Sequence, residues 1–280
     1  PIKRLGGVHN LLQGGLASLN RIEAVLNEPE SIRERPDARA LGSLVGDFEF
    51  SGVSFDYGEG PILEGLDILL PAGRVYALVG PSGAGKSTLL SLIAGFEQPE
   101  RGAIFVDRED ITALAPALRP VTILFQENNL FAHLSLARNI GLGRHPGLQL
   151  SAQDTTRIEE AVAAVGLEGL EDRLPESVSG GERQRAALAR RLCQDRAVLL
   201  LDEPFNSLDP ALRHEMRLLV DRLRRERCLT VLLVSHNPEE AAEIADTALF
   251  VHGGQVLEQG NLEELLKHPQ TAQLAHYLGK

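Results

Sequence analysis

The segment Gly80–Thr88 combines residue types and a spacing that suit phosphate binding: a glycine, four residues, and then Gly-Lys-Ser. Its glycines let the backbone curl so that successive N–H groups point at phosphate oxygens. Lys86 would place an ammonium on the β- and γ-phosphates, and the Ser87 hydroxyl would be a ligand of Mg²⁺. A turn that merely joins two elements needs neither side chain. We therefore expect a nucleotide to bind at Gly80, Pro81, Ser82, Gly83, Ala84, Gly85, Lys86, Ser87 and Thr88.

Two acidic residues stand at the end of an apolar run. Ala197–Leu201 reads as a buried strand, and Asp202 and Glu203 follow it directly. Doubly wound sheets bind their ligands at the carboxyl ends of the strands, which is where these carboxylates would lie. Asp202 suits a place near Mg²⁺, directly or through water, and Glu203 suits a general base for the attacking water. A solvated acidic pair is the alternative, and the phosphate-binding loop upstream makes it the weaker one.

A second glycine-rich stretch lies at Ser177–Arg185, which reads Ser-Val-Ser-Gly-Gly-Glu-Arg-Gln-Arg. Two glycines after a serine, followed by a long helical pattern, predict a helix N-terminus with exposed N–H groups, and such a helix end suits a phosphate. A single nucleotide does not need two such helix ends from one domain. This stretch therefore distinguishes the chain from a generic nucleotide-binding domain.

The predicted strands and helices would hold these groups in place. Val75–Val79 reads as a buried strand before the loop, and Thr88–Ala94 as a helix after it. Further strand signals lie at Phe48–Tyr57, Ile62–Leu70, Ala103–Val106, Val121–Phe125, Val198–Leu201, Leu229–Val234 and Ala248–Val251. Residues 134–192 are mostly helical in pattern, with Ser151 as the cap of a helix that runs to Val165. Parallel strands that alternate with helices, with a helical insertion in the middle, predict an α/β fold.

The N-terminal part differs in pattern from the rest of the chain. Apolar residues at steps of three and four over residues 1–28 predict an amphipathic helix about 40 Å long. The charged, proline-bearing stretch 28–40 reads as a linker. The apolar stripe of the helix could pack on its own domain or could continue from, or dock to, a membrane subunit. We expect the helix and linker over 1–44, a nucleotide-binding domain over 45–262 with a helical subdomain at about 127–195, and a short helical tail over 263–280.

Composition limits the classes of function. The 280 residues include 39 acidic and 28 basic ones, for a formal charge of −11. A surface this negative repels phosphate backbones, which argues against nucleic acid as a partner. The two cysteines, Cys193 and Cys228, lack metal-ligand spacing, so we expect reduced thiols in a cytosolic protein. No apolar run approaches the ~18 residues needed to span a bilayer.

The chain from about Phe48 to Gly260 resembles the ATP-binding cassette (ABC) family, because several separate motifs occur in the order typical of that family. Tyr57 matches the aromatic residue that stacks on adenine. Gln126 matches the glutamine that approaches Mg²⁺ and senses the transport subunit. The segment Asn206–Asp209 matches the loop that signals between two sites, and His236 matches the switch histidine near the γ-phosphate.

The resemblance implies a P-loop NTPase fold with a RecA-like core, an antiparallel β subdomain and an α-helical signature subdomain. It implies ATP and Mg²⁺ as cofactors and a head-to-tail homodimer that hydrolyses ATP. The implied catalytic residues are Glu203, His236 and Gln126, and the implied Mg²⁺ site comprises Ser87, Gln126 and Asp202. Besides residues 80–88, the residues that it assigns to ATP are Tyr57, Ser179, Gly180, Gly181 and Asp209, and the signature residues 179–181 would act on the second subunit's nucleotide.

Two positions depart from the family pattern. Val178 stands where leucine is usual, and Glu182 stands where glutamine is commonest. Both departures keep the helix start, and the glycines that must approach a phosphate are intact.

Two parts of the chain resemble different branches of the family. Arg119–Phe131 and the pair Pro204-Phe205 resemble the ATPases of bacterial importers, most of all those for thiamine. This resemblance implies import of thiamine or a related small solute through integral membrane permease subunits. It places the chain as a peripheral protein on the cytoplasmic face of the bacterial inner membrane and leaves open a periplasmic or surface solute-binding protein. Residues 1–30 instead resemble the segment that leads into the nucleotide-binding domain of exporter half-transporters, so an exporter remains the alternative.

Overall fold

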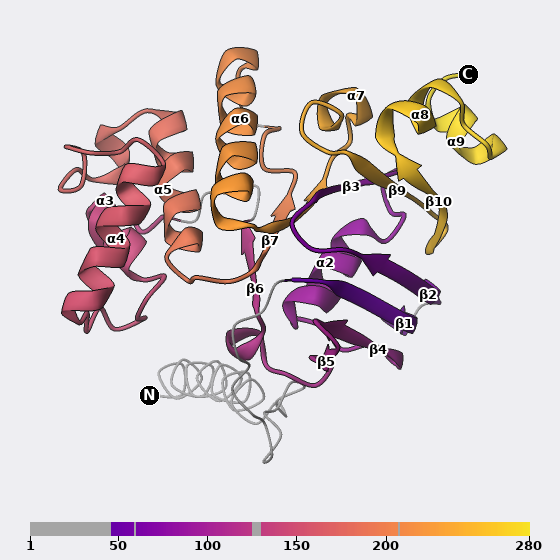
Figure 1. Cartoon of the computed structure of the whole chain (residues 1–280), viewed down its shortest axis with the longest axis horizontal. Helices are drawn as coiled ribbons and strands as arrows, with labels where there is room; N and C mark the ends of the chain where they lie inside the picture. The colour runs from indigo at the N-terminus through magenta and orange to yellow at the C-terminus, as the bar shows by residue number, and fades with distance from the viewer. Residues whose placement is uncertain (1–45, 59, 125–129, 207) are drawn as a thin grey trace, which may run out of the picture. The chain divides into compact units, whose positions relative to one another are not determined.

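The computed structural model describes residues 46–58, 60–124, 130–206 and 208–280, which are drawn in colour in Figure 1. The predicted N-terminal helix and its linker, Gln126 and Ser207 lie outside the described residues. Within the described part, one six-stranded and one four-stranded β-sheet form the framework. Helices are interspersed with the strands along the chain, so the architecture is the α/β type that the sequence predicts.

The six-stranded sheet has the order β10-β9-β3-β8-β7-β6. Neighbouring strands run parallel, except that β10 runs antiparallel to β9. Its central strands are buried on both faces, which explains why they read as continuous apolar runs. The strands are β3 (Val75–Val79), β6 (Val121–Leu124), β7 (Val198–Asp202), β8 (Thr230–Val234), β9 (Thr247–His252) and β10 (Gln255–Asn261).

The four-stranded sheet is antiparallel, in the order β2-β1-β4-β5. Along β1, the side chains of Phe48 and Phe50 are buried, whereas those of Glu49 and Ser51 are exposed. This alternation is expected of a sheet with one covered face. The strand predicted to end at Tyr57 ends one residue earlier, at Asp56. The strands are β1 (Phe48–Asp56), β2 (Pro61–Leu70), β4 (Arg101–Val106) and β5 (Glu109–Asp110).

Two hydrophobic cores lie on opposite faces of the six-stranded sheet. Val75, Ala77 and Val79 of β3 belong to the core shared with most of the helices. Tyr76 and Leu78, which point the other way, belong to the core shared with helix α2 and the four-stranded sheet. Figure 1 shows α2 between the two sheets. The strand that leads into the phosphate-binding loop is therefore packed on both sides.

Helix α2 (Lys86–Ala94) is held at its C-terminal end by Arg119, whose side chain is fully buried. The guanidinium donates hydrogen bonds to the carbonyl oxygens of Leu92 and Ile93 in the last turn of α2, and also to those of Leu114 and Thr112. A cation at this end complements the helix dipole. Burial lowers the pKa of Arg119 to about 10. Anchoring this end of α2 also fixes its N-terminus, where the loop lies.

The predicted helical region contains α3 (Leu136–Gly141), α4 (Ala152–Ala164) and α5 (Gly180–Leu192), which contact one another. Ser151 caps α4 as predicted, in a capping box with Asp154, and α4 ends one residue before Val165. The long helix α6 (Pro210–Arg227) follows β7. In the described residues, none of the helices has the length and apolar character to cross a bilayer.

The C-terminal part is more structured than the single short helix that the sequence predicts. Helix α7 (Pro238–Ala241) follows β8, and α8 (Leu262–Lys267) and α9 (Ala272–Tyr277) follow β10. Asn261 is the last residue of β10 and caps α8. Leu262 and Leu274 are buried in the hydrophobic core that the six-stranded sheet shares with most of the helices. Helices α8 and α9 therefore pack against that sheet.

Candidate functional site

The phosphate-binding loop joins the end of β3 to the start of α2. At two of its positions, the backbone conformation and the close neighbours leave room only for glycine. Gly80 has φ +148°, and a Cβ there would lie 2.1 Å from the carbonyl oxygen of Val251. Gly85 has φ +99° and would place a Cβ 2.7 Å from Cδ2 of Leu63. The helix begins at Lys86, two residues before the predicted start, with Gly85 as its N-cap. The free N–H groups of its first turn therefore lie at the loop, as phosphate binding requires.

Lys86 is held inside this loop. Its side chain is buried, and Nζ donates hydrogen bonds of 2.8 Å to the carbonyl oxygens of Gly80 and Pro81. Burial lowers the pKa of Lys86, while the nearby carboxylates of Glu203 and Asp202 act in the opposite direction. The loop thus fixes one ammonium group at its centre, where it can bind phosphate oxygens.

Ser87 and Asp202 bring two candidate Mg²⁺ ligands together. Ser87 Oγ lies 3.4 Å from Asp202 Oδ1, so the first turn of α2 meets the end of β7. Burial raises the pKa of Asp202, Glu203 adds to the increase, and the Ser87 hydroxyl opposes it. Hydroxyl and carboxylate oxygens are the donors that Mg²⁺ prefers, so the residues present fit this ion. No cluster of three or more His, Cys, Asp or Glu side chains suited to a metal occurs in the described ranges.

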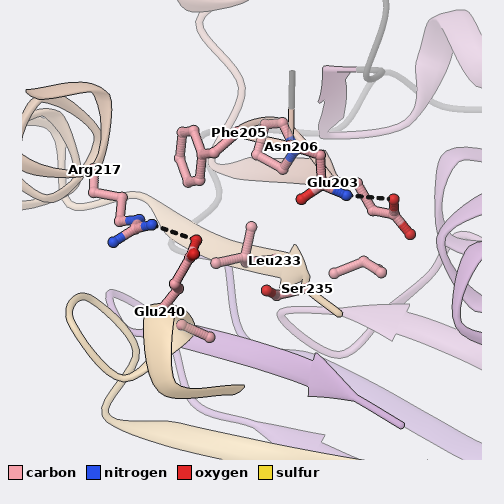
Figure 2. Close-up of a pocket in the computed structure, with 10 residues that line it drawn as sticks. Glu203, Phe205, Asn206, Arg217, Leu233, Ser235 and Glu240 are labelled. Atoms are coloured by element: carbon pink, nitrogen blue, oxygen red, sulfur yellow. Dashed lines mark hydrogen bonds and ion pairs between the residues drawn. The ribbon is translucent and has the colours of Figure 1, made fainter. Parts of the chain in front are cut away.

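Glu203 and His236 are in direct contact through Oε1 and Nε2. Each follows the carboxyl end of a strand, β7 for Glu203 and β8 for His236, and the two strands pair in parallel with Asp202 opposite Val234. Asn206 donates a hydrogen bond of 2.7 Å to Glu203 Oε2, as Figure 2 shows. Glu203 also adopts φ +48°, a left-handed conformation that non-glycine residues rarely occupy and that is often found at functional sites. The carboxylate is therefore held from both sides.

Lys86, Ser87, Glu203 and His236 line one open pocket with a volume of about 310 Å³. That is within the range of about 300–1,000 Å³ typical of small-molecule sites. Its lining brings together eight residues that the sequence predicts and one that it does not, Ile62 of β2. No sequence signal identifies Ile62, because it reaches the site from the other sheet. The lining residues are Ile62, Ser82, Gly83, Gly85, Lys86, Ser87, Thr88, Glu203 and His236.

Tyr57 is placed just beyond β1 and does not line this pocket. Its side chain is 58% exposed, and its ring meets Phe55 edge to face at a centroid distance of 4.7 Å. An exposed aromatic ring can stack on a planar base.

Ser179 is the N-cap of α5, in the position that the glycine-rich stretch predicts. Its hydroxyl accepts a hydrogen bond of 3.3 Å from Glu182 N–H, and Glu182 Oε2 accepts one of 2.7 Å from Ser179 N–H. This second hydrogen bond is the main cause of the lowered pKa of Glu182. Glutamate at the position where glutamine is commonest therefore completes a capping box and stabilises the helix start.

The structure does not bring Ser179, Gly180 or Gly181 into the pocket beside Lys86. Ser179 and Gly180 are exposed, whereas Gly181 is buried, and a Cβ on it would lie 2.6 Å from Leu212 Cδ1. Asp209, the N-cap of α6, accepts a hydrogen bond of 3.0 Å from Leu212 N–H and is also outside the pocket. The start of α5 and the start of α6 therefore lie next to each other.

Comparisons with known proteins agree with this geometry. Residues 63–206 match the sequence profile of the ABC transporter family. The thiamine import ATP-binding protein ThiQ of Brucella suis biovar 1 (strain 1330) is 50% identical over 234 residues, which are 84% of this chain and 96% of that protein. The structure of cbiO1 from Clostridium perfringens, part of the ABC transporter complex cbiONQ, is 27% identical with a TM-score of 0.73, over 81% of this chain and 92% of that one.

A second solved structure, a bacterial Atm1-family ABC exporter with ATP bound, is 28% identical with a TM-score of 0.77. The match covers 98% of this chain and 48% of the exporter chain. The predicted cassette fold, with its P-loop core, antiparallel β subdomain and helical subdomain, is confirmed by these matches. The chain therefore belongs to the ABC transporter family, as one of its ATP-hydrolysing subunits.

Proposed function

We propose that this ABC ATPase energises the import of thiamine or a closely related small solute. The observation that carries the proposal is the 50% identity to a thiamine import ATP-binding protein over 96% of that protein's length. The exporter with the similar fold is only 28% identical to this chain, although the structural match covers 98% of this chain. The importer is accordingly favoured over the exporter that the N-terminal residues suggested.

ATP hydrolysis would take place in the pocket between the loop, β7 and β8. Lys86 and the N–H groups at the start of α2 would bind the β- and γ-phosphates. Glu203, held by Asn206, would orient the attacking water and accept its proton, and His236 would position Glu203 beside the γ-phosphate. Mg²⁺ held by Ser87, Asp202 and Gln126 would neutralise charge on the phosphates.

Two copies of the chain would complete each site. Ser179 and Gly180 expose a capped helix start that does not line the pocket of their own chain. In a head-to-tail homodimer, this helix start would close over the γ-phosphate bound by the other copy. Asp209, adjacent to the α5 start through Leu212, would then connect the two sites.

The dimer would act on integral membrane permease subunits at the cytoplasmic face of the bacterial inner membrane. Gln126 would report the nucleotide state to the permease, and a periplasmic or surface solute-binding protein would deliver the solute. The formal charge of −11 disfavours nucleic acid as a partner.

Transport by vesicles containing the chain and the membrane subunits encoded beside its gene tests this proposal. We expect ATP-dependent accumulation of radiolabelled thiamine, and its loss in the Glu203→Gln variant. Accumulation of an unrelated solute in preference to thiamine would overturn the substrate assignment. ATP-driven movement in the opposite direction would overturn import.

A further inference from the structure

The C-terminal helix α9 contacts the segment that carries His236 through Tyr277. The phenol donates a hydrogen bond of 3.3 Å to the backbone carbonyl oxygen of His236. The Tyr277 ring packs against Phe250 of β9 at a centroid distance of 5.6 Å. Phe250 is the register partner of Val79, the residue before Gly80. The hydroxyl therefore lies where the start of the phosphate-binding loop and the switch histidine come together.

The position of α9 is itself fixed by a buried carboxylate. Glu258 of β10 is 8% exposed, and it accepts hydrogen bonds of 2.7 Å from Thr271 N–H and 2.5 Å from the Thr271 hydroxyl. Thr271 is the N-cap of α9, and Leu274 in the following turn is 2% exposed. The helix that carries Tyr277 is thus anchored to the sheet at its start and by its buried face.

The segment that carries His236 has less support. Ser235 and Asn237 form a short turn, in which Ser235 Oγ accepts a hydrogen bond of 3.1 Å from Asn237 N–H. An open space of about 360 Å³ is lined by His236–Glu239 together with Tyr277 and Leu278. Since water can enter this space, close packing does not hold the turn there. A hydrogen bond from an anchored helix can supply the missing constraint.

We propose that Tyr277 is a positioning residue for ATP hydrolysis, whose hydroxyl fixes the backbone of His236 and, through it, the imidazole on Glu203. The proposal rests on the proposed catalytic roles of Glu203 and His236. Small displacements of a catalytic group slow a reaction, so the effect belongs to turnover and not to nucleotide affinity.

The first test compares Tyr277→Phe with the parent chain in steady-state ATP hydrolysis. Phenylalanine keeps the ring on Phe250 and removes only the hydroxyl. We expect kcat to fall about 3- to 10-fold, the scale of one lost hydrogen bond, with KM for ATP within about twofold and Tm unchanged. Gln273→Ala, on an exposed position of the same helix, is the matched control and should leave kcat unchanged.

A purely structural role for Tyr277 makes a different prediction. Tyr277→Leu removes the ring packing as well as the hydroxyl, so its Tm should fall while its kcat matches that of Tyr277→Phe. If kcat instead follows Tm, with Tyr277→Phe fully active and only Tyr277→Leu impaired, the proposal is wrong.

A double-mutant cycle identifies the route of the effect. In a His236→Ala background, Tyr277→Phe should change kcat by less than about twofold, because the group that it positions is gone. An undiminished effect of Tyr277→Phe in that background would contradict the proposal. If His236→Ala itself leaves kcat unchanged, the proposed catalytic role of His236 fails, which is a separate result from failure of the Tyr277 inference.

Discussion

The imidazole of His236 lies directly against the carboxylate of Glu203, at the ends of two adjacent parallel strands. The backbone N–H of Glu203 donates a hydrogen bond of 3.3 Å to the Val234 carbonyl oxygen, so the two segments are also joined by their main chains. Asn206 holds the second carboxylate oxygen. Because both oxygens have partners, the carboxylate is presented to the pocket in one orientation, as a general base requires.

Replacing Glu203 by Gln removes the proposed base and keeps the size of the side chain. We expect kcat for ATP hydrolysis to fall by about 10²- to 10⁴-fold, with ATP affinity retained. Glu239→Gln, which changes a nearby exposed carboxylate, serves as the control. Turnover measured together with binding of a fluorescent ATP analogue checks both parts. Near-normal turnover of the Glu203→Gln chain would remove Glu203 from the catalytic role.

Substituting Gly80 tests the shape of the phosphate-binding loop. The Gly80→Ala methyl would collide with the Val251 carbonyl oxygen, which belongs to a central strand, and the φ of +148° disfavours any side chain. We expect a loss of about 2–4 kcal/mol in unfolding free energy. Gly180→Ala is a suitable comparison for stability, because its nearest neighbour would be Arg183 Nη2 at 3.8 Å. Equal unfolding midpoints of the two variants in urea would show that the predicted collision does not occur.

A buried arginine joins the helix after Asp209 to the helix after His236. Arg217 of α6, whose side chain is 6% exposed, pairs with Glu240 at 2.5 Å and Glu243 at 2.6 Å, and Figure 2 shows the first pair. Removing it leaves two carboxylates without this partner. We expect Arg217→Ala to lower the free energy of unfolding by about 2–3 kcal/mol. This is less than the full cost of breaking a buried ion pair, because both glutamates are partly exposed.

The comparison for Arg217 is Arg225, on the same helix. Arg225 pairs with Asp221 at 2.6 Å, but its side chain is 70% exposed. Such surface pairs contribute about 0–1 kcal/mol. Thermal unfolding of Arg217→Ala and Arg225→Ala should therefore differ clearly, and a similar small loss in both would contradict the importance of burial.

Only one of the two cysteines should react quickly with an alkylating reagent. Cys193 is buried, and burial raises the pKa of its thiol to about 11. At pH 8 only about one in a thousand such thiols is ionised, and the thiolate is the reactive form. Cys228 is exposed. Mass spectrometry after brief labelling at pH 8 should find the label on Cys228, and rapid labelling of Cys193 in the folded chain would contradict its burial.

The sequence predicts the parts of the site whose signal is local. The phosphate-binding loop is defined by residues within nine positions, and β3 is recognisable because all five of its residues are apolar and buried. The start of α2 is misplaced by two residues because Lys86 and Ser87 are polar and interrupt the apolar pattern. Capping at Ser151 and Ser179 is predictable, since serine lies three residues before an acidic side chain in both cases.

Features built by distant residues escape sequence reasoning. Strand β10 is polar in sequence and becomes a strand by pairing with β9. Helix α9 has six residues, too few to show a helical period. Tyr277 and His236 are 41 positions apart in sequence, and Ile62 enters the pocket from a separate sheet. No local pattern encodes such contacts, because they depend on how the strands are ordered.

A structure of the Glu203→Gln chain with ATP and Mg²⁺ tests the central claim, the ATP-bound homodimer, most directly. We predict two copies in head-to-tail contact, with the γ-phosphate held by the Lys86 loop of one copy and hydrogen-bonded to Ser179 of the partner subunit. A γ-phosphate bound at Lys86 with Ser179 of every copy remote from it would contradict the account.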